Sequence, residues 1–299
     1  MFRGGLLVFL GACSFGVVST FVKLAYKQGY TLGDVTGSQA FFALLILWPL
    51  YFLQTRSKSF RAQQQPQTTP TWKLILAGTT NGLVSMAYYQ CVQMTQASVA
   101  IILLMQFTWI SMLLEAVLFK KKPTWLQMMA VVLVLGGTVL ASGMLETQVE
   151  NLSWAGIGFG MLAALGYSIF LIVNGRVGNE LSPVKKSAWM ITGSAILVFL
   201  VFPPEFLING SLQEGLGALG LVFALFAAVI PPVLFAKGIP KAGVVLSSIL
   251  STVELPVAVA MSYFVLQEPV TTLRWMGVLV ILLALVLPNL KRKKQLATL

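Results

Sequence analysis

Val244–Leu266 has the sequence VVLSSILSTVELPVAVAMSYFVL, which is about the length of a helix that crosses a bilayer. It nevertheless carries a carboxylate, Glu254, ten residues from its start, and Pro256 follows two residues later. At ~1.5 Å rise per residue, Glu254 would lie ~15 Å from the end of the span, near the middle of a ~30 Å hydrocarbon layer. A charge at that depth costs ~2.5–3.5 kcal/mol on insertion scales, so it usually faces a cavity or a partner. We therefore expect the rest of the chain to enclose a cavity around Glu254.

The composition of the whole chain supports a membrane protein. Of its 299 residues 57% are hydrophobic and 10% are charged, and the mean hydropathy is +0.86. A soluble domain usually has ~25% charged residues, which keep its surface hydrated. The chain is therefore predicted to be an all-α, polytopic membrane protein.

Ten apolar segments are predicted to cross the membrane, each close to the length that a bilayer requires. They are Leu6–Ala25, Val35–Leu53, Leu74–Met94, Val99–Phe119, Trp125–Leu145, Trp154–Val173, Ser187–Phe202, Leu216–Ala236, Val244–Leu266 and Trp275–Leu290. The longest connection, Gln54–Thr71, is polar and is expected to be a flexible cytoplasmic loop. The N-terminus lacks the features of a removable signal peptide, so the first segment is expected to remain as an uncleaved span.

The positive charges fall in alternate loops. Seventeen of the twenty Lys and Arg residues lie on one side of the predicted membrane, namely Arg3, Arg56, Lys58, Arg61, Lys73, Lys120–Lys122, Arg176, Lys185, Lys186, Lys237, Lys241 and Lys291–Lys294. The other side collects Lys27 and Arg274 with the acids Asp34, Glu146, Glu150, Glu205, Glu214 and Glu268. Positive residues in short loops stay in the cytoplasm, so both termini are predicted to be cytoplasmic, in a plasma (inner) membrane. This distribution accounts for the net charge of +11 without a nucleic-acid partner.

The ten segments divide into two related halves. Segments four and nine align at an offset of 145 residues, which pairs Val99 with Val244, and segments one and six align more weakly at 152. Each half has five spans, an odd number, so the second half is inverted relative to the first. The predicted repeats are residues 1–146 and residues 151–299, the second with a basic cytoplasmic tail. Inverted repeats are typical of transporters that bind substrate between the halves near the bilayer midplane.

Several short motifs resemble those of a known family. Phe15-Gly16-Val17-Val18-Ser19-Thr20-Phe21-Val22-Lys23 resembles the first-span pattern of the drug/metabolite transporter superfamily, EamA type. Leu255-Pro256-Val257, Leu266-Gln267-Glu268-Pro269 and Trp275-Met276-Gly277 resemble the pattern that ends each EamA repeat. The resemblance covers the whole chain and implies ten spans in two halves.

The first repeat departs from this pattern, because Thr108 to Ser111 contains no proline and Lys120 to Lys122 stand where a glutamate is usual. The resemblance implies export or exchange of small metabolites, often amino acids or amines. Members of the family differ widely in substrate, so the resemblance does not identify the substrate.

Glu254 shares a helical stripe with serines, Ser247 and Ser251 among them, at spacings of three and four residues. The repeat places Gln106 and Trp109 at the matching positions of the first half. We expect these side chains to line the cavity. The alternative is that the small residues only let helices pack closely, as they often do in membranes.

A second group of candidate residues is aromatic and polar. Asn81, Ser85 and Tyr88 form a stripe on the third segment, with Tyr89 beside it, and the repeat pairs Phe15 with Tyr167. Aromatic walls with a few polar anchors are typical of small-molecule sites, and ring faces attract ammonium groups. Each ring taken singly could equally be core packing.

Two other charges in the apolar segments are expected near the interface. Lys23 lies near the outer end of the first span, from which its long side chain can reach the interface. Glu115 lies near the inner end of the fourth span, close to Lys120–Lys122, and is expected to form an ion pair there. Neither is predicted to contact Glu254.

No enzyme, cofactor or metal motif is present. The chain has no histidine, no phosphate-binding loop and no second acid at the depth of Glu254 to form a catalytic pair. Cys13 and Cys91 both lie inside predicted spans and are expected to be free thiols. We therefore expect no cofactor, and no transport driven by ATP bound to this chain.

The sequence thus favours a secondary transporter that exports or exchanges small organic metabolites by alternating access. In this hypothesis Glu254 binds an amine group of the substrate, a proton, or each in turn, because burial favours a neutral carboxyl and a cationic ligand favours a charged one. The partners are a small-molecule substrate, the lipid bilayer and, if transport is coupled, protons. The alternatives are an uncoupled facilitator and a membrane binding or scaffold protein without flux. Oligomeric state and coupling ion stay open.

Overall fold

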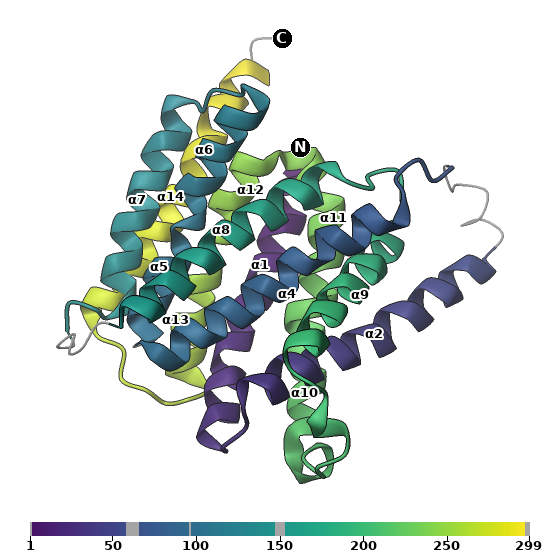
Figure 1. Cartoon of the computed structure of the whole chain (residues 1–299). Helices are drawn as coiled ribbons and strands as arrows, with labels where there is room; N and C mark the ends of the chain where they lie inside the picture. The colour runs from purple at the N-terminus through teal and green to yellow at the C-terminus, as the bar shows by residue number, and fades with distance from the viewer. Residues whose placement is uncertain (1, 58–65, 96, 147–152, 297–299) are drawn as a thin grey trace.

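The computed structural model describes residues 2–57, 66–95, 97–146 and 153–296, and these residues form a bundle of helices (Figure 1). Eight helical segments are long and apolar enough to cross a membrane. A further helix of 24 residues, α4 (Thr71–Met94), is more polar, and the last helix, α14 (Thr272–Leu296), is apolar from Thr272 to Pro288. Within the described residues the chain is therefore an all-helical membrane protein with ten helical segments, as predicted.

The helices of the first half are α1 (Phe2–Lys27), α2 (Leu32–Arg56), α4, α5 (Ala97–Met105), α6 (Phe107–Phe119) and α7 (Trp125–Ser142). Those of the second half are α8 (Trp154–Arg176), α9 (Pro183–Val201), α10 (Gly217–Phe223), α11 (Ile230–Ala242), α12 (Val244–Ser251), α13 (Glu254–Phe264) and α14. Short helices η1 (Glu205–Leu207), η2 (Leu212–Leu216) and η3 (Ala224–Val229) connect and interrupt this second set. The predicted loop residues Lys58, Arg61 and Gln63–Gln65, the acid Glu150, and the first two residues of the predicted second repeat lie outside the described residues.

Local sequence signals start the helices where the loops end. Thr31 and Thr124 each begin a helix with a capping box, in which the threonine and the residue three positions later, Asp34 or Gln127, bond each other's backbone N–H. Each such cap stabilises a helix start by ~1 kcal/mol.

The fourth and ninth spans are each broken near the middle. In the ninth span α12 ends at Ser251 and α13 begins at Glu254, so the span is two helices and not one. Pro256 has no N–H for the carbonyl of Thr252, four residues earlier, and its ring excludes a regular turn there. Glu254 therefore stands at the first position of a new helix, directly after the break.

The break in the fourth span has a different cause, because that span contains no proline. The N–H of Gln106 bonds the carbonyl three residues back, Leu103, at 3.2 Å. The side-chain Nε2 of the same glutamine donates to the carbonyl of Ile102 at 2.9 Å, which the backbone N–H no longer reaches. One side-chain amide thus satisfies the carbonyl that the break exposes.

The two halves make matching contacts with each other. Helix α1 packs against α11, α12 and α13, and α8 packs in the corresponding way against α4, α5 and α6. The pairs α7 with α14 and α2 with α9 each join one helix to its own counterpart. This is the pattern expected of two related halves that meet around a central axis.

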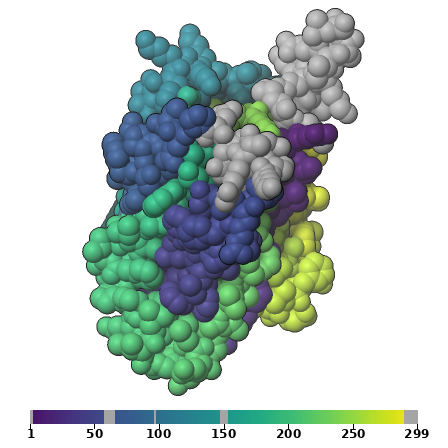
Figure 2. All heavy atoms as spheres, turned by 90° about the vertical axis from the view of Figure 1, so that its right-hand side faces the viewer, coloured from purple at the N-terminus to yellow at the C-terminus, as the bar shows by residue number. Residues whose placement is uncertain are grey.

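Apolar side chains cover the outside of the bundle. Helix α2, dark blue in Figure 2, lies on this outer face against the green α9 and α10. Its exposed side chains include Leu45, Leu50, Phe52 and Leu53. An exposed apolar surface of this kind is what lipid chains cover in a membrane.

One group of predicted loop charges is placed differently. Ser182 caps α9 and Pro183 occupies its first turn, so this helix begins four residues before the predicted start at Ser187. Lys186 is consequently inside a helix and 1% exposed, and its Nζ donates to Asn174 O at 2.6 Å and Asn179 Oδ1 at 3.0 Å. The prediction that Lys186 lies in a loop was wrong, because the capping signal lies upstream of the apolar run.

Candidate functional site

A cavity lies between the two halves, next to the break in the ninth span. It offers about 50 Å³ to the centres of water molecules, enough for a few waters or a compact organic group. Its lining consists of Phe15, Val18, Ser19, Asn81, Val84, Ser85, Tyr88, Tyr89, Leu104, Tyr167, Ala227 and Glu254. Both halves contribute to it, through α1, α4 and α5 on one side and α8, η3 and α13 on the other.

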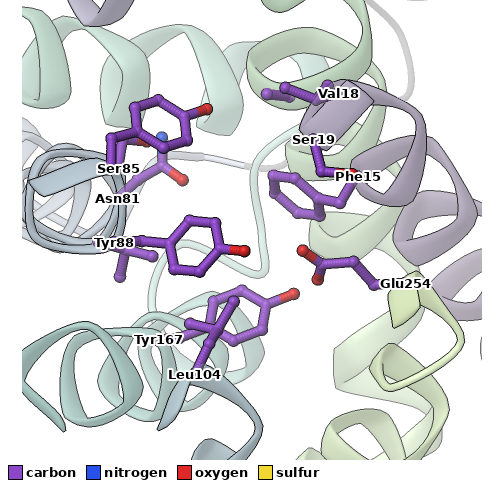
Figure 3. A pocket seen from close by; sticks show the side chains of 12 residues that line it. Phe15, Val18, Ser19, Asn81, Ser85, Tyr88, Leu104, Tyr167 and Glu254 are labelled. Atoms are coloured by element: carbon purple, nitrogen blue, oxygen red, sulfur yellow. The ribbon is translucent and has the colours of Figure 1, made fainter. Parts of the chain in front are cut away.

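Glu254 is the one acidic or basic side chain among the residues that line this cavity. It is partly exposed, and Figure 3 shows that its carboxylate points into the cavity toward the hydroxyls of Tyr88 and Tyr167. No ion pair joins it to any other described residue. The structure thus places an uncompensated carboxylate in a hollow inside a membrane-spanning segment.

Aromatic rings form the wall around the carboxylate. The rings of Phe15 and Tyr167 meet edge to face with centroids 6.1 Å apart, and Phe107 supports Tyr167 from behind at 4.5 Å. Tyr88 and Tyr89 lie 6.0 Å apart on the opposite helix, α4. These contacts hold the rings in fixed positions, so the ring faces around Glu254 are preformed.

The polar groups of α4 lie on another part of the cavity wall. Asn81 is 6% exposed, and its Nδ2 has no hydrogen-bond partner in the described structure. Gln39, from α2, accepts from Tyr89 Oη at 3.2 Å and contacts Ser85 Oγ at 3.5 Å. Gln39 therefore fixes Tyr89 and Ser85, whereas Asn81 keeps a free donor.

Seven of the eleven predicted site residues are brought together around this cavity. They are Phe15, Asn81, Ser85, Tyr88, Tyr89, Tyr167 and Glu254. Whether they bind substrate stays a prediction.

The other four predicted residues do not line the cavity. Gln106 accepts a hydrogen bond from Trp109 Nε1 at 2.8 Å, so these two side chains bind each other at the break in the fourth span. Ser247 donates to the carbonyl of Gly243 at 2.7 Å and is completely buried. Ser251 is also buried, beside Tyr167. Neither the Ser251 hydroxyl nor the Tyr167 hydroxyl makes a hydrogen bond of normal geometry. The predicted stripe assumed one continuous helix, whereas the helix is broken between Ser251 and Glu254.

Five lining residues were not predicted. Val18 and Ser19 follow Phe15 by three and four positions on α1, so the helical spacing could have identified them. Val84, Leu104 and Ala227 are apolar residues without any distinguishing signal in the sequence.

A wider vestibule adjoins the cavity. It offers about 360 Å³ to water centres, and Ser19 and Tyr88 belong to the lining of both spaces. Its charged residues are Lys23, Glu268 and Arg274. Lys23 Nζ lies 3.5 Å from Glu268 Oε2, and Glu268 also accepts a hydrogen bond from Ser262. Lys23 thus pairs with a loop acid near the end of its span and not with Glu254, as predicted.

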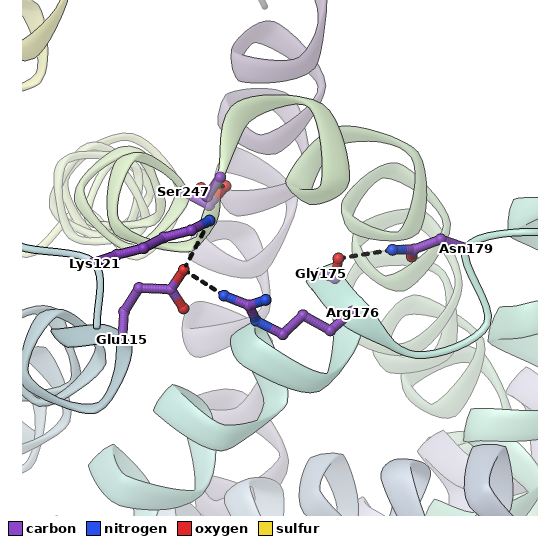
Figure 4. Close-up of polar contacts among 7 residues, drawn as sticks. Glu115, Lys121, Gly175, Arg176, Asn179 and Ser247 are labelled. Atoms are coloured by element: carbon purple, nitrogen blue, oxygen red, sulfur yellow. Dashed lines mark hydrogen bonds and ion pairs between the residues drawn. The ribbon is translucent and has the colours of Figure 1, made fainter. Parts of the chain in front are cut away.

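A second ion pair lies at the other end of α8 and α6. Arg176 Nη2 donates to Glu115 Oε1 at 2.6 Å, and Lys121 Nζ lies 3.5 Å from the same oxygen (Figure 4). Glu115 is 2% exposed, and the guanidinium of Arg176 also lies over the ring of Phe119 at 3.4 Å. The predicted ion pair of Glu115 with a basic residue near the helix end is confirmed.

Metal binding has no support in the described part of the chain, where no group of three or more Cys, Asp or Glu side chains lies together. Cys13 and Cys91 are free thiols.

Comparison with known proteins defines the class to which this fold and cavity belong. Residues 2–143 and 154–290 each match the EamA-like transporter family, which together is nearly the whole chain. The chain belongs to the EamA-like transporter family. It is accordingly a multi-pass membrane transporter and not an enzyme.

More distant similarities add less. The chain is 34% identical over 95 residues to bacteriorhodopsin of Halobacterium halobium (strain shark), covering 30% of this chain and 44% of that protein. The same share of this chain matches bacteriorhodopsin-I of Haloarcula marismortui at 34% identity and covers 37% of that protein. The chain thus spans less than half of these relatives. A solved structure titled only "Crystal structure of protein" matches with a TM-score of 0.72 at 13% identity, over 96% of this chain and 97% of that one, and shows the fold alone.

Proposed function

We propose that this protein is a secondary transporter in the plasma membrane that exports or exchanges small organic metabolites carrying an amino group. The proposed substrates are amino acids and amines. The observation that carries this proposal is the carboxylate of Glu254, which faces a cavity between the two halves and has no ionic partner among the described residues. An ammonium group in that cavity supplies the missing positive charge.

The surroundings of Glu254 favour a cationic group over bulk water. Inside the membrane a carboxylate without a partner is costly, so a bound cation or proton stabilises it. The faces of Phe15, Tyr88 and Tyr167 add attraction for an ammonium group, worth ~0.5–2 kcal/mol for a ring. Glu254 alternately binds an ammonium group and a proton, which gives proton–substrate antiport.

Alternating access needs the cavity to open on one side at a time. The cavity adjoins the vestibule next to Lys23 and Glu268, whereas Arg176 and Glu115 join α8 to α6 at the other end. With cytoplasmic termini, which the positive charges predict, the vestibule faces outward. Both ion pairs are formed in this structure, and we infer that the Arg176–Glu115 pair breaks when the halves move to open the bundle at that end.

The repeat supports this inference. Arg176 and Lys23 stand one residue out of register in the alignment of α8 with α1. Arg176 pairs with Glu115 on α6, and Lys23 pairs with Glu268 in the loop that follows α13, the counterpart of α6. Two related halves can exchange conformations, so that the two ends of the bundle open in turn.

The test uses purified protein in proteoliposomes with an imposed pH gradient. Glu254→Gln keeps the shape of the side chain and removes its charge, so it should abolish coupled exchange of an amine or amino acid. Glu205→Gln, at the exposed first residue of η1, is the matched control and should transport normally. Coupled exchange that survives in a folded Glu254→Gln protein contradicts the proposal.

The same assay separates the alternatives. An uncoupled facilitator would show flux that does not depend on the pH gradient. A binding or scaffold protein would show no flux, and a centre filled by side chains would favour it. The cavity and its adjoining vestibule oppose that alternative.

A further inference from the structure

Among the described residues that line the central cavity, Glu254 is the sole acidic or basic one, and the others contribute hydroxyls, one amide, rings and aliphatic groups. Lys23 and Arg274 line the vestibule and not the cavity. A ligand held at Glu254 therefore finds a partner for an ammonium group but no cation for a carboxylate.

We propose, on the basis of the function proposed above, that the cavity selects amines without a carboxylate and discriminates against amino acids. In an α-amino acid the carboxylate is attached to the same carbon as the ammonium group. It would be held a few ångströms from Glu254, inside the protein and without a compensating charge. Two carboxylates that share one site disfavour each other's charged form, so the amino acid binds more weakly than the amine made from it by loss of CO₂.

The unpaired donor of Asn81 indicates a second group that the ligand should carry, a hydrogen-bond acceptor. Asn81 lines the cavity, its Nδ2 is buried without a hydrogen-bond partner in the described structure, and an unpaired buried donor is costly. A ligand with a neutral acceptor, such as a hydroxyl oxygen, would satisfy it. Figure 3 places Asn81 and Glu254 on opposite sides of the cavity, so an amino alcohol held between them would face both side chains.

The size of the cavity limits the ligand further. About 50 Å³ for water centres corresponds to roughly three to five waters at ~10–15 Å³ each, which suits an amine of similarly few heavy atoms. A longer substituent has to extend past Ser19 and Tyr88 into the vestibule.

The experiment compares matched pairs on the full-length protein. Ethanolamine and serine differ by one carboxylate, and so do phenethylamine and phenylalanine. Thermal-shift titration gives relative affinities, because a ligand that binds only the folded form raises its unfolding temperature. Counterflow of the radiolabelled compounds in proteoliposomes gives transport. We expect each amine to bind at least ~10-fold more tightly than its amino acid, which corresponds to ~1.4 kcal/mol.

Two variants assign the effect to residues. Asn81→Leu should remove the preference for ethanolamine over propylamine and leave the affinity for propylamine unchanged. The substitution removes only the contact between the Asn81 amide and the hydroxyl oxygen of ethanolamine. Glu254→Gln should weaken the binding of all amines and should reduce the difference in affinity between ethanolamine and serine. If either residue had only a structural role, its substitution would weaken the binding of all ligands equally.

The outcomes separate this proposal from the general function. Serine or phenylalanine binding as tightly as its amine overturns the selectivity. If that binding still needs Glu254 and counterflow persists, the transporter function stands. Absence of binding by all four compounds also overturns the selectivity. Absence of Glu254-dependent counterflow for any amine or amino acid in a wider panel overturns the transporter function itself.

Discussion

Arg176 and Glu115 join α8 to α6 through a contact of 2.6 Å between guanidinium and carboxylate. The acid is almost completely buried, and the arginine is one third exposed and lies over the ring of Phe119. Lys23 and Glu268 make the corresponding contact at the vestibule, at 3.5 Å and with both side chains about one third exposed. The first contact is shorter and better buried, which agrees with a bundle closed at that end.

Loss of the Arg176 guanidinium should open the closed end. Arg176→Gln leaves the buried Glu115 carboxylate with only the exposed Lys121, 3.5 Å away, and a buried charged group that loses its bond costs ~1–3 kcal/mol. Since ~1.4 kcal/mol is a factor of ten, a cysteine at the buried position 247 should react at least ~10-fold faster with a membrane-impermeant maleimide. The measurement uses Ser247→Cys in a Cys13→Ala, Cys91→Ala background.

Lys121→Gln is the control for this experiment. Lys121 is 66% exposed and 3.5 Å from Glu115, and exposed pairs contribute ~0.2–1 kcal/mol or less. It should change the labelling rate little. Equal labelling in Arg176→Gln and in the unmodified background would show that this ion pair does not close the bundle.

The pair at the vestibule should respond to reversal of its charges. Lys23→Glu places two acids together, so the transport rate should fall. A difference of ~0.2–1 kcal/mol for an exposed pair corresponds to a ~1.5–5-fold decrease. Adding Glu268→Lys should restore the rate, because the pair is rebuilt with opposite polarity. Lys73→Glu, at an exposed site on α4, is the control for a change of net charge alone. A double variant that transports no better than Lys23→Glu argues against the contact.

Close packing of α4 on α9 should be sensitive to one methyl group. A Cβ at Gly78 would lie 1.7 Å from the carbonyl oxygen of Met190 and 2.6 Å from its Cα. Both are backbone atoms, so Gly78→Ala must separate the helices, and overpacking of this kind costs ~1–3 kcal/mol. The thermal unfolding midpoint in detergent should fall by several degrees. Gly136→Ala, where nothing lies within 4 Å, should not lower it.

The contact of Glu180 with the end of the α2–α4 loop should be lost in acid. Partial burial acts to raise the pKa of Glu180, but hydrogen bonds from its own backbone and from Thr69 outweigh it and lower the pKa from 4.5 to about 2. The stabilisation is therefore complete above about pH 4.5 and disappears as the pH falls toward 2.

Hydrogen exchange at one amide measures this change. The N–H of Thr69 donates to Glu180 Oε1 at 2.8 Å and should be protected at neutral pH. Protection relative to the intrinsic exchange rate should fall between pH 4.5 and 2, and Glu180→Gln should weaken it at every pH. Protection that does not change over this range would contradict the assignment.

Much of the architecture was predictable because hydropathy and charge act over whole segments. The position of Glu254 in a cavity followed from its depth alone, since an isolated carboxylate in the hydrocarbon layer requires a hollow or a partner. The ion pair of Glu115 followed from its place near the end of the span.

The details of the site depended on where the helix ended. Ser247 and Ser251 share a stripe with Glu254 only if the helix is continuous, and the break after Ser251 removes them from the cavity. Gln106 and Trp109 were expected to face the cavity as the counterparts of Ser251 and Glu254, but their own hydrogen bond holds them at the other break. Such local bonds depend on side-chain geometry that hydropathy does not encode.

The breaks in the fourth and ninth spans differ in whether the helix can become continuous again. A pyrrolidine ring interrupts the ninth span whatever its surroundings, so that span cannot become straight without an unsatisfied carbonyl. In the fourth span a single rotatable amide, that of Gln106, bridges the gap. Turning it away would free the carbonyl of Ile102 to accept the backbone N–H of Gln106 and let two short helices become one. Of the two repeats, only the N-terminal one can therefore straighten its fourth span without leaving a carbonyl unsatisfied.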